Sequence, residues 1–519
     1  MYDDDEPLFD PVGYDDEYDN ELLPESIVLG DSVDDSVLTD RRRNCLFIAV
    51  SILLIISLVG SSIIILFIAV RNDGWGVARE RVERVKSGPT AAPATVAAAV
   101  FTPLPVAEPI DSPNLPEINR IAIINQDGQL ETMSPVGTDR HVLTLRSDRI
   151  VYQLPTWAPD GNHLAIVGNQ PSGGGVYVLE DVPPGEPITI ADRRIYFSDN
   201  QPPFYLYWSP DGDRLAFLAE HSRGLVGLNV VDKSGVEAAR VLAIGSSIHW
   251  DWSRDGRQML VHTERSRSNR SLTFVDMSGQ TATGNLAVPG DFQAPGIGQD
   301  GRYWAFAERT NDGLSALVVV DTQSGGRQAY DRGGSLALGW SPVRDQIAFT
   351  HSAPNSHPLW GPLRRLDVAT GEIRVLSSQA VLAFFWSPDG RSIAFITLSR
   401  DTNDTDISAY KEDGVRRANR VAFVPVQRPG RTMLTLSVID VESGTGLRLL
   451  DFQPTVAYLS QFLPYFDQYA LSHRIWAPDS SAIVLPVRED DANRIYVVPT
   501  DGRRPYYLAD GAVAFWSRN

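Results

Sequence analysis

The residues of this chain that could perform acid–base chemistry are aspartates that recur along its length. They include Asp160, Asp211, Asp255, Asp300 and Asp389, and each precedes a glycine. Two carboxylates can act as general acid and general base only when both reach the same reacting group. Asp-Gly is a turn sequence, in which the carboxylate accepts hydrogen bonds from nearby backbone. We therefore interpret these aspartates as turn residues and not as catalytic groups.

The other patterns that would indicate catalysis are absent from the sequence. The chain has no G-x-S-x-G elbow for a serine nucleophile and no G-x-x-x-x-G-K-[ST] loop for a nucleotide. Its 8 histidines show no H-x-x-x-H or H-E-x-x-H spacing, and Cys45 is its single cysteine. The sequence therefore predicts no catalytic residue, no bound metal, no cofactor and no enzymatic activity.

The run from Asp401 to Asp406 resembles half of a calcium-binding loop. It lacks the glycine at the sixth position and the distal bidentate glutamate of such loops. A solvated acidic loop is the favoured interpretation, and calcium binding at this run stays open as the alternative.

The turn aspartates belong to a repeat with a period close to 45 residues. WAPDGNHLAI, WSPDGDRLAF and WSPDGRSIAF are three copies, and Ile297 stands at the Trp position of a fourth. In each unit an apolar strand ends at Trp, a tight turn follows, and further short strands complete a β-meander. Four-stranded units of this length around one axis make an all-β β-propeller. The structural repeat tryptophans are Trp157, Trp208, Trp252, Trp340, Trp386, Trp476 and Trp516.

The number of strands predicts how this propeller closes. The sequence contains eight innermost strands and eight third strands, but seven second strands. The incomplete unit has its innermost strand at Val513–Trp516 and another strand at Ile121–Asn125, so the two ends of the chain build one blade. We predict eight blades of antiparallel sheets, four-stranded except for a three-stranded last blade, and seven blades is the alternative.

The WSPDG-x-x-[LI]-AF pattern resembles the TolB-type, WD-like bacterial β-propeller superfamily over about residues 118–516. The resemblance implies a propeller fold. It implies no single function, because propellers of this kind serve as scaffolds, as receptors and as lids of prolyl-oligopeptidase-type enzymes.

Two insertions interrupt the repeat between Trp386 and Trp476, which are 90 residues apart. One follows the second strand of that blade and the other follows its fourth strand, so both leave the sheet at the same end and meet on one face. Aromatic residues together with arginine are typical of interface hot spots, although the aromatic side chains could instead pack the insertions onto the propeller. The predicted binding residues are Tyr465, Phe466, Tyr469, Phe462, Arg416, Arg417, Arg420 and Trp360.

The first part of the chain has a different composition. Residues 1–40 contain 15 acidic and no basic residues, which predicts a disordered tail and accounts for most of the net charge of −19. Residues 46–70 form an uncharged apolar run of 25 residues, long enough for a single transmembrane helix. Residues 71–117 read as a charged juxtamembrane segment and a Pro/Ala-rich stalk, and residues 118–519 as the propeller.

Arg41, Arg42 and Arg43 adjoin the apolar run, so we expect the acidic tail in the cytoplasm and the propeller outside the cell membrane. The chain has no basic face for nucleic acid. We predict a non-enzymatic, membrane-anchored β-propeller that presents a binding or scaffolding face to a protein, a peptide or an envelope glycan. The alternatives are a propeller subunit of a hydrolase or peptidase system, and a transmembrane signalling receptor that uses the acidic tail.

Overall fold

The computed structural model describes residues 119–183, 190–222, 224–266, 269–281, 285–291, 294–354, 360–399 and 432–518. The predicted acidic tail, the apolar run 46–70, the stalk and the run Asp401–Asp406 lie outside these residues. In the part of the chain that is described, no helix is both long and apolar enough to cross a membrane. The domain boundaries predicted before residue 118 therefore stay predictions.

The described chain is almost entirely built of short antiparallel β-strands. Three sheets hold four consecutive strands: β4 (Val151–Trp157), β5 (His163–Gln170), β6 (Gly173–Glu180) and β7 (Arg194–Ser198); β8 (Pro203–Trp208), β9 (Arg214–Ser222), β10 (Leu225–Asp232) and β11 (Arg240–Gly245); β15 (Gly296–Ile297), β16 (Tyr303–Arg309), β17 (Ser315–Asp321) and β18 (Arg327–Gly333). Two sheets hold three strands: β12 (Ser247–Trp252), β13 (Gln258–Ser266) and β14 (Asn269–Asp276); β26 (Ala482–Glu489), β27 (Ala492–Pro499) and β28 (Tyr506–Asp510). The 3-10 helices η1 (Arg146–Asp148) and η2 (Ile190–Arg193) lie in connections.

A larger sheet of seven strands contains two repeat units joined by one long strand. Its strands are β19 (Leu336–Trp340), β20 (Gln346–His351), β21 (Gly361–Asp367), β22 (Ile373–Trp386), β23 (Ser392–Leu398), β24 (Leu434–Asp440) and β25 (Gly446–Phe452). β22 has 14 residues. Its first part pairs with β21 and its last part pairs with β23, so β22 is the outer strand of one unit and the inner strand of the next.

The remaining sheet joins the two ends of the described chain. β29 (Val513–Trp516) pairs with β1 (Ile121–Ile124), which continues into β2 (Leu130–Met133) and β3 (His141–Val142). Ile121 lies opposite Trp516, and Ile124 lies opposite Val513. The predicted pairing of these two segments is confirmed. The prediction of three strands in this unit is wrong, because the two residues of β3 pair with β2 and add a fourth strand.

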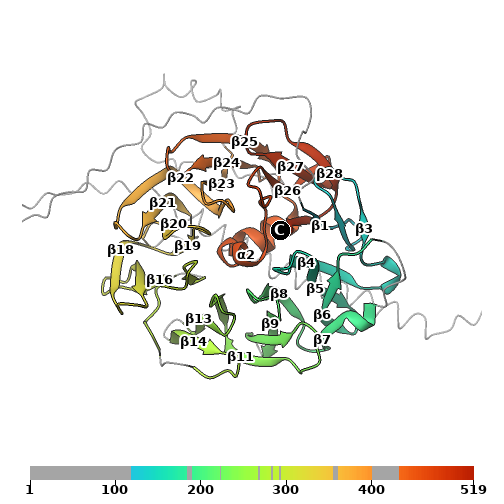
Figure 1. Ribbon diagram of the computed structural model, residues 1–519, viewed down its shortest axis with the longest axis horizontal. Helices are drawn as coiled ribbons and strands as arrows, with labels where there is room; N and C mark the ends of the chain where they lie inside the picture. The colour runs from blue at the N-terminus through green and yellow to red at the C-terminus, as the bar shows by residue number, and fades with distance from the viewer. Residues whose placement is uncertain are drawn as a thin grey trace, which may run out of the picture. The chain divides into compact units, whose positions relative to one another are not determined.

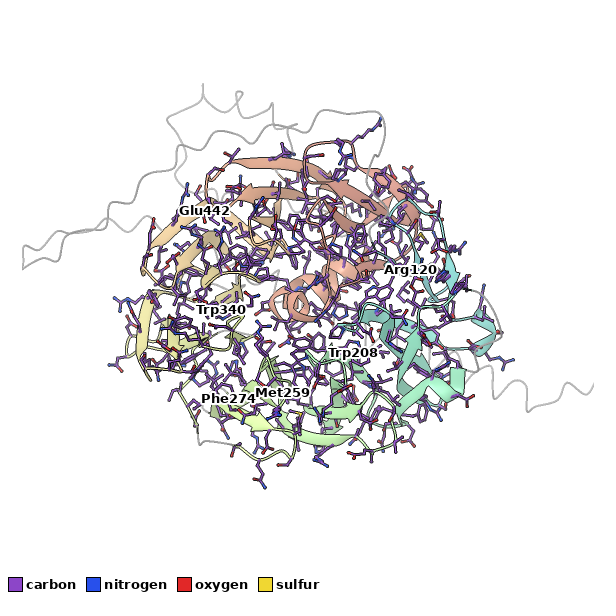
Figure 2. The ribbon with its side chains drawn as sticks, viewed as in Figure 1. Arg120, Trp208, Met259, Phe274, Trp340 and Glu442 are labelled. Atoms are coloured by element: carbon purple, nitrogen blue, oxygen red, sulfur yellow. The ribbon has the colours of Figure 1, made fainter. Side chains whose placement is uncertain are left out.

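The sheets follow one another around a centre that holds the helix α2 (Phe466–Ser472) (Figure 1). Trp208 and Trp340 lie on the inner side of their sheets, toward that centre (Figure 2). The aspartates at the ends of the inner strands serve the turns, as predicted. Asp211 Oδ1, for example, accepts the Asp213 N–H at 3.1 Å, and Gly212 adopts a φ of +72° that favours glycine.

The repeat tryptophans also connect neighbouring sheets. Five of their indole N–H groups donate to a backbone carbonyl in the preceding unit, at N···O distances from 2.9 to 3.4 Å. Each acceptor is the residue directly before the corresponding tryptophan of that unit, so one bond geometry repeats from sheet to sheet. The bonds run from Trp157 to Phe515, Trp208 to Thr156, Trp252 to Tyr207, Trp386 to Gly339 and Trp476 to Phe385.

Candidate functional site

The centre of the molecule is occupied by residues 455–473, which we call the central segment. It contains a π-helical turn, η4 (Tyr458–Phe462), a 3-10 turn, η5 (Leu463–Tyr465), and α2. Its aromatic side chains pack against the inner strands from different sheets: the ring of Phe462 lies 5.6 Å from that of Phe515 in β29, and Phe466 lies 5.1 Å from Phe384 in β22. These buried rings hold the segment in place through apolar contact.

Hydrogen bonds tie the central segment to three further inner strands. The Gln468 side chain accepts the Trp250 N–H at 2.8 Å and donates to the Trp250 carbonyl at 2.9 Å, so it pairs with β12 as a strand would. The Tyr205 hydroxyl of β8 donates to the Gln468 carbonyl at 2.9 Å. The Thr156 hydroxyl of β4 donates to the Ser472 carbonyl at 2.7 Å. Opposite sides of the fold are therefore cross-linked through α2.

Asp467 is a buried carboxyl group on the same helix. Its Oδ2 accepts the Ala294 N–H at 2.9 Å, while Oδ1 has no hydrogen-bond partner among the described residues. Burial raises the pKa of Asp467 to about 6. Among the described residues, no group of three or more acidic, histidine or cysteine side chains is placed to hold a metal ion.

Arg474 and Arg518 lie at the C-terminal end of the central segment, and Arg254 lies in the turn after β12. Arg518 Nη2 donates to the Leu471 carbonyl of α2 at 3.1 Å, and Arg474 Nη1 donates to the Arg518 carbonyl at 3.2 Å. Arg254 donates to the Ile297 carbonyl at 2.9 Å and to the Gly298 carbonyl at 3.1 Å. Every one of these hydrogen bonds goes to a neutral backbone oxygen.

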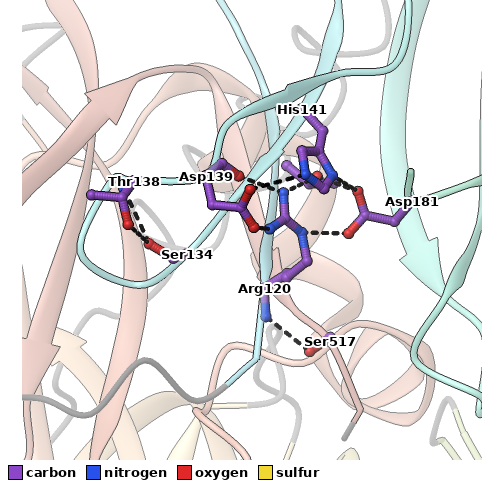
Figure 3. A network of polar contacts seen from close by, with 8 residues as sticks. Arg120, Ser134, Thr138, Asp139, His141, Asp181 and Ser517 are labelled. Atoms are coloured by element: carbon purple, nitrogen blue, oxygen red, sulfur yellow. Dashed lines mark hydrogen bonds and ion pairs between the residues drawn. The ribbon is translucent and has the colours of Figure 1, made fainter. Parts of the chain in front are cut away.

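A second polar cluster lies at the junction of the terminal strands (Figure 3). Buried Asp181, which follows β6, forms an ion pair with Arg120 and accepts from Thr132 at 2.5 Å. His141 Nδ1 lies 2.8 Å from Asp181, and its Nε2 lies 3.2 Å from Asp139. A histidine between two carboxylates could transfer a proton, but in the described chain neither ring nitrogen bonds a serine, threonine or cysteine. We interpret the cluster as a structural link between the β1–β29 sheet and the β4–β7 sheet.

The residues predicted to bind a partner do not form one exposed group among the described residues. Phe462, Phe466 and Tyr469 are buried, so their side chains are not part of an exposed face in this structure. Tyr465 is 48% exposed, and Trp360 is half-buried against the core. Arg416, Arg417 and Arg420 lie outside the described residues. The two insertions do begin at one sheet end, because Leu398 pairs with Leu434 and Leu434 pairs with Phe452.

Sequence reasoning missed Arg254 and Arg518, although the repeat contains a signal for them. Five repeat units carry Pro at the second position after their tryptophan, as in Trp208-Ser209-Pro210. Arg254 and Arg518 occupy this position in their own units.

No protein-family model matches the chain, and no curated protein matches it. Similar solved structures include oligogalacturonate lyase from Vibrio parahaemolyticus (13% identity, 67% of this chain and 85% of that chain, TM-score 0.41) and TolB from Acinetobacter baumannii (16% identity, 68% and 81%, TM-score 0.33). A prolyl endopeptidase structure is similar at 10% identity over 72% of this chain and 51% of that chain, with a TM-score of 0.45.

The prediction that the chain is not an enzyme is corrected by this comparison. The similar structures include the enzymes oligogalacturonate lyase, prolyl endopeptidase and puromycin hydrolase as well as TolB. The prediction rested on missing catalytic motifs, and a propeller can take part in catalysis without carrying such a motif itself. The described part of this chain is itself built almost entirely of antiparallel β-sheets.

Proposed function

We propose that this chain is a membrane-anchored, eight-bladed β-propeller that binds a protein, peptide or envelope glycan outside the cell membrane. The membrane anchor is residues 46–70, with the acidic tail on the cytoplasmic side. The number of blades follows from counting the seven-stranded sheet as two units that share β22, together with the six other sheets. The pairing of β29 with β1 supports closure of the ring.

The observation that carries this proposal is that the central segment fills the centre of the fold. Gln468, Tyr205 and Phe466 bind it to inner strands from several sheets, so it belongs to the core of the structure. A substrate or peptide therefore does not pass along the propeller axis, and binding takes place on a face.

The exposed side of the central segment provides such a face. Val456, Leu459 and Tyr465 are large apolar residues with exposed side chains, and they belong to a segment whose other aromatic residues are buried. A rigidly held tyrosine contributes contact area to an interface at little cost in conformational entropy.

A photo-cross-linking experiment tests this proposal. A photoreactive phenylalanine derivative replaces Tyr465 in the full chain, and a matched chain carries it at Val236, which is 85% exposed on an outer connection. We expect discrete adducts from position 465 in intact cells and none from position 236. Equal labelling at positions 465 and 236, or no labelling at 465, would contradict a binding face on the central segment.

The second candidate is the propeller of a hydrolase or peptidase system. The repeat pattern, which also resembles the propellers of prolyl-oligopeptidase-type enzymes, favours it. In that case we expect the protein cross-linked to position 465 to be a hydrolase. The complex should then cleave a substrate that the isolated chain leaves intact. A role of residues 1–40 in signalling is tested separately, by binding of that tail to cytoplasmic proteins at low and high salt.

A further inference from the structure

His141 lies between two carboxylates in the cluster at the junction of the terminal strands (Figure 3). Its Nδ1 lies 2.8 Å from Asp181 Oδ1, and its Nε2 lies 3.2 Å from Asp139 Oδ1. An ionised carboxylate accepts hydrogen bonds and donates none, so both contacts are hydrogen bonds only when both ring nitrogens carry hydrogen. The geometry therefore fits the positively charged imidazolium ring better than either neutral tautomer.

Arg120 keeps the two carboxylates in their ionised form. It forms ion pairs with Asp181 Oδ2 and Asp139 Oδ2, which are the oxygens that His141 does not contact. Desolvation acts to raise the pKa of Asp139, but the charges of Arg120 and His141 outweigh it and hold that pKa below its usual value. Two carboxylates thus face one arginine and one histidine, and their charges balance only while the histidine ring is doubly protonated.

The surrounding strand β2 brings no further charge to the ring. Its Thr132 is neutral and donates to Asp181 at 2.5 Å. Glu131, the residue before it, points to the opposite face of the strand and pairs with Arg140 at 2.7 Å. Loss of the second ring proton would therefore leave the cluster with a net negative charge and one carboxylate contact without its donor.

The contact with Asp139 is the one that should break when the ring becomes neutral. A neutral ring keeps one N–H, and the contact with Asp181 is the shorter of the two and is buried. The side chain of Asp139 is 64% exposed, so water can replace the ring as its partner. The same exposure gives the Nε2 proton a path to solvent.

We propose that His141 is a pH-dependent clasp, whose protonated ring fastens the sheet that joins the two ends of the described chain to the end of β6. A histidine in an unfolded chain is charged below about pH 6.5. The stabilisation by the imidazolium ring is therefore fully present below that pH, and it is lost as the pH rises and the folded ring gives up its second proton. The clasp is independent of the proposed binding face.

A double-mutant cycle tests the clasp in the full chain in detergent. His141→Gln removes the titrating group, and Asp139→Asn removes its exposed partner; asparagine tolerates the φ of +50° at this position. Chemical denaturation of the four chains at pH 5.5 and pH 8.5 gives the coupling between the two substitutions. We expect the coupling to change the folding equilibrium constant by about three- to tenfold at pH 5.5 and by less than about twofold at pH 8.5.

His163 provides a matched control on a neighbouring sheet. Its Nδ1 lies 2.7 Å from one carboxylate, that of Asp160, so a neutral ring can keep this contact. The coupling between His163→Gln and Asp160→Asn should therefore change by less than about twofold between the two pH values. A coupling between His141 and Asp139 that is the same at both pH values overturns the proposal, and so does an equal pH dependence of the two cycles.

Amide hydrogen exchange of the unaltered chain is a second measurement that needs no variant. The protection of Ile121–Ile124 in β1, relative to that of β27 and corrected for intrinsic exchange rates, should fall at least about threefold from pH 5.5 to pH 8.5. A ratio that does not change with pH would count against a clasp at this junction.

Discussion

A repeat tryptophan in this chain performs two tasks with one side chain. Its ring fills space between neighbouring sheets, and its indole N–H reaches the inner strand of the preceding unit. Trp516 and Trp340 only fill space, because their indole N–H groups have no hydrogen-bond partner among the described residues. This difference separates the contribution of the hydrogen bond from that of packing.

The comparison of Trp208→Phe with Trp516→Phe measures that hydrogen bond. Both tryptophans are buried, but Trp208 loses its bond to the Thr156 carbonyl and leaves that acceptor unsatisfied. We expect Trp208→Phe to reduce the free energy of unfolding by about 1–2 kcal/mol more than Trp516→Phe does. Chemical denaturation of both variants gives this difference, and equal losses would mean that packing alone matters.

Asp467 predicts a pH dependence of stability with a defined sign. Its pKa is about 6 in the folded state, against a usual value of 3.8, so the folded chain holds a proton that the unfolded chain releases. This group therefore favours folding fully below pH 3.8, and its contribution is lost as the pH rises through 6, by roughly 2–3 kcal/mol. Asp467→Asn removes the dependence and keeps an oxygen for the Ala294 N–H.

The measurement is the difference in unfolding free energy between Asp467→Asn and the unaltered chain across pH 4–8. The unfolding free energy of the variant, relative to that of the unaltered chain, should increase up to about pH 6 and stay constant above that pH. A difference that does not change with pH would show that Asp467 titrates normally.

At the scale of elements, the sequence predicted the strands better than it predicted the central segment. The Trp and Asp-Gly positions mark strand ends because turn chemistry is local, and those assignments are confirmed at Asp211 and Gly212. The aromatic residues after Phe452 indicated an insertion, which we expected on one face, whereas the structure places α2 in the centre and buries Phe466. That choice depends on the space enclosed by sheets far apart in sequence, which no local pattern contains.

Adjacent residues test the position of the central segment. Phe466 is 2% exposed, whereas Tyr465 is 48% exposed. Phe466→Ala should destabilise the fold by about 3–5 kcal/mol, because it leaves a cavity between α2 and β22. Tyr465→Ala should change stability by less than about 0.5 kcal/mol. Thermal unfolding of the two variants provides the comparison. Similar losses of stability in both variants would contradict the position of the central segment described above.

At the scale of the whole molecule, the sequence predicted which segments close the structure. The pairing of β1 with β29 followed from counting strands, because a missing strand at one end implies a strand supplied by the other. The cluster of Arg120 with Asp181 beside this junction could not be predicted, since its members become neighbours only after the sheets form. In this cluster the positive charge of Arg120 is balanced by the carboxylates of Asp139 and Asp181.

Removal of residues 511–519 should therefore destabilise the entire fold. The deletion takes away β29 with the buried rings of Phe515 and Trp516, each worth roughly 1.5–3 kcal/mol or more. Removal of residues 1–40 serves as the control and should leave the Tm unchanged. A C-terminal deletion without effect on the Tm would mean that closure does not depend on β29.

The pairing of β1 with β29 also determines when folding can finish during synthesis. Arg120 and Ser517, which bond beside these strands, are 397 positions apart. At about 5–20 residues per second, a ribosome needs roughly 20–80 s to cover that distance. Throughout this time one side of β1 has no partner strand, and an open strand edge can pair with another nascent chain. Translation that terminates shortly before β29 would make the unpaired edge permanent, so late stop codons should be unusually prone to yield aggregated product.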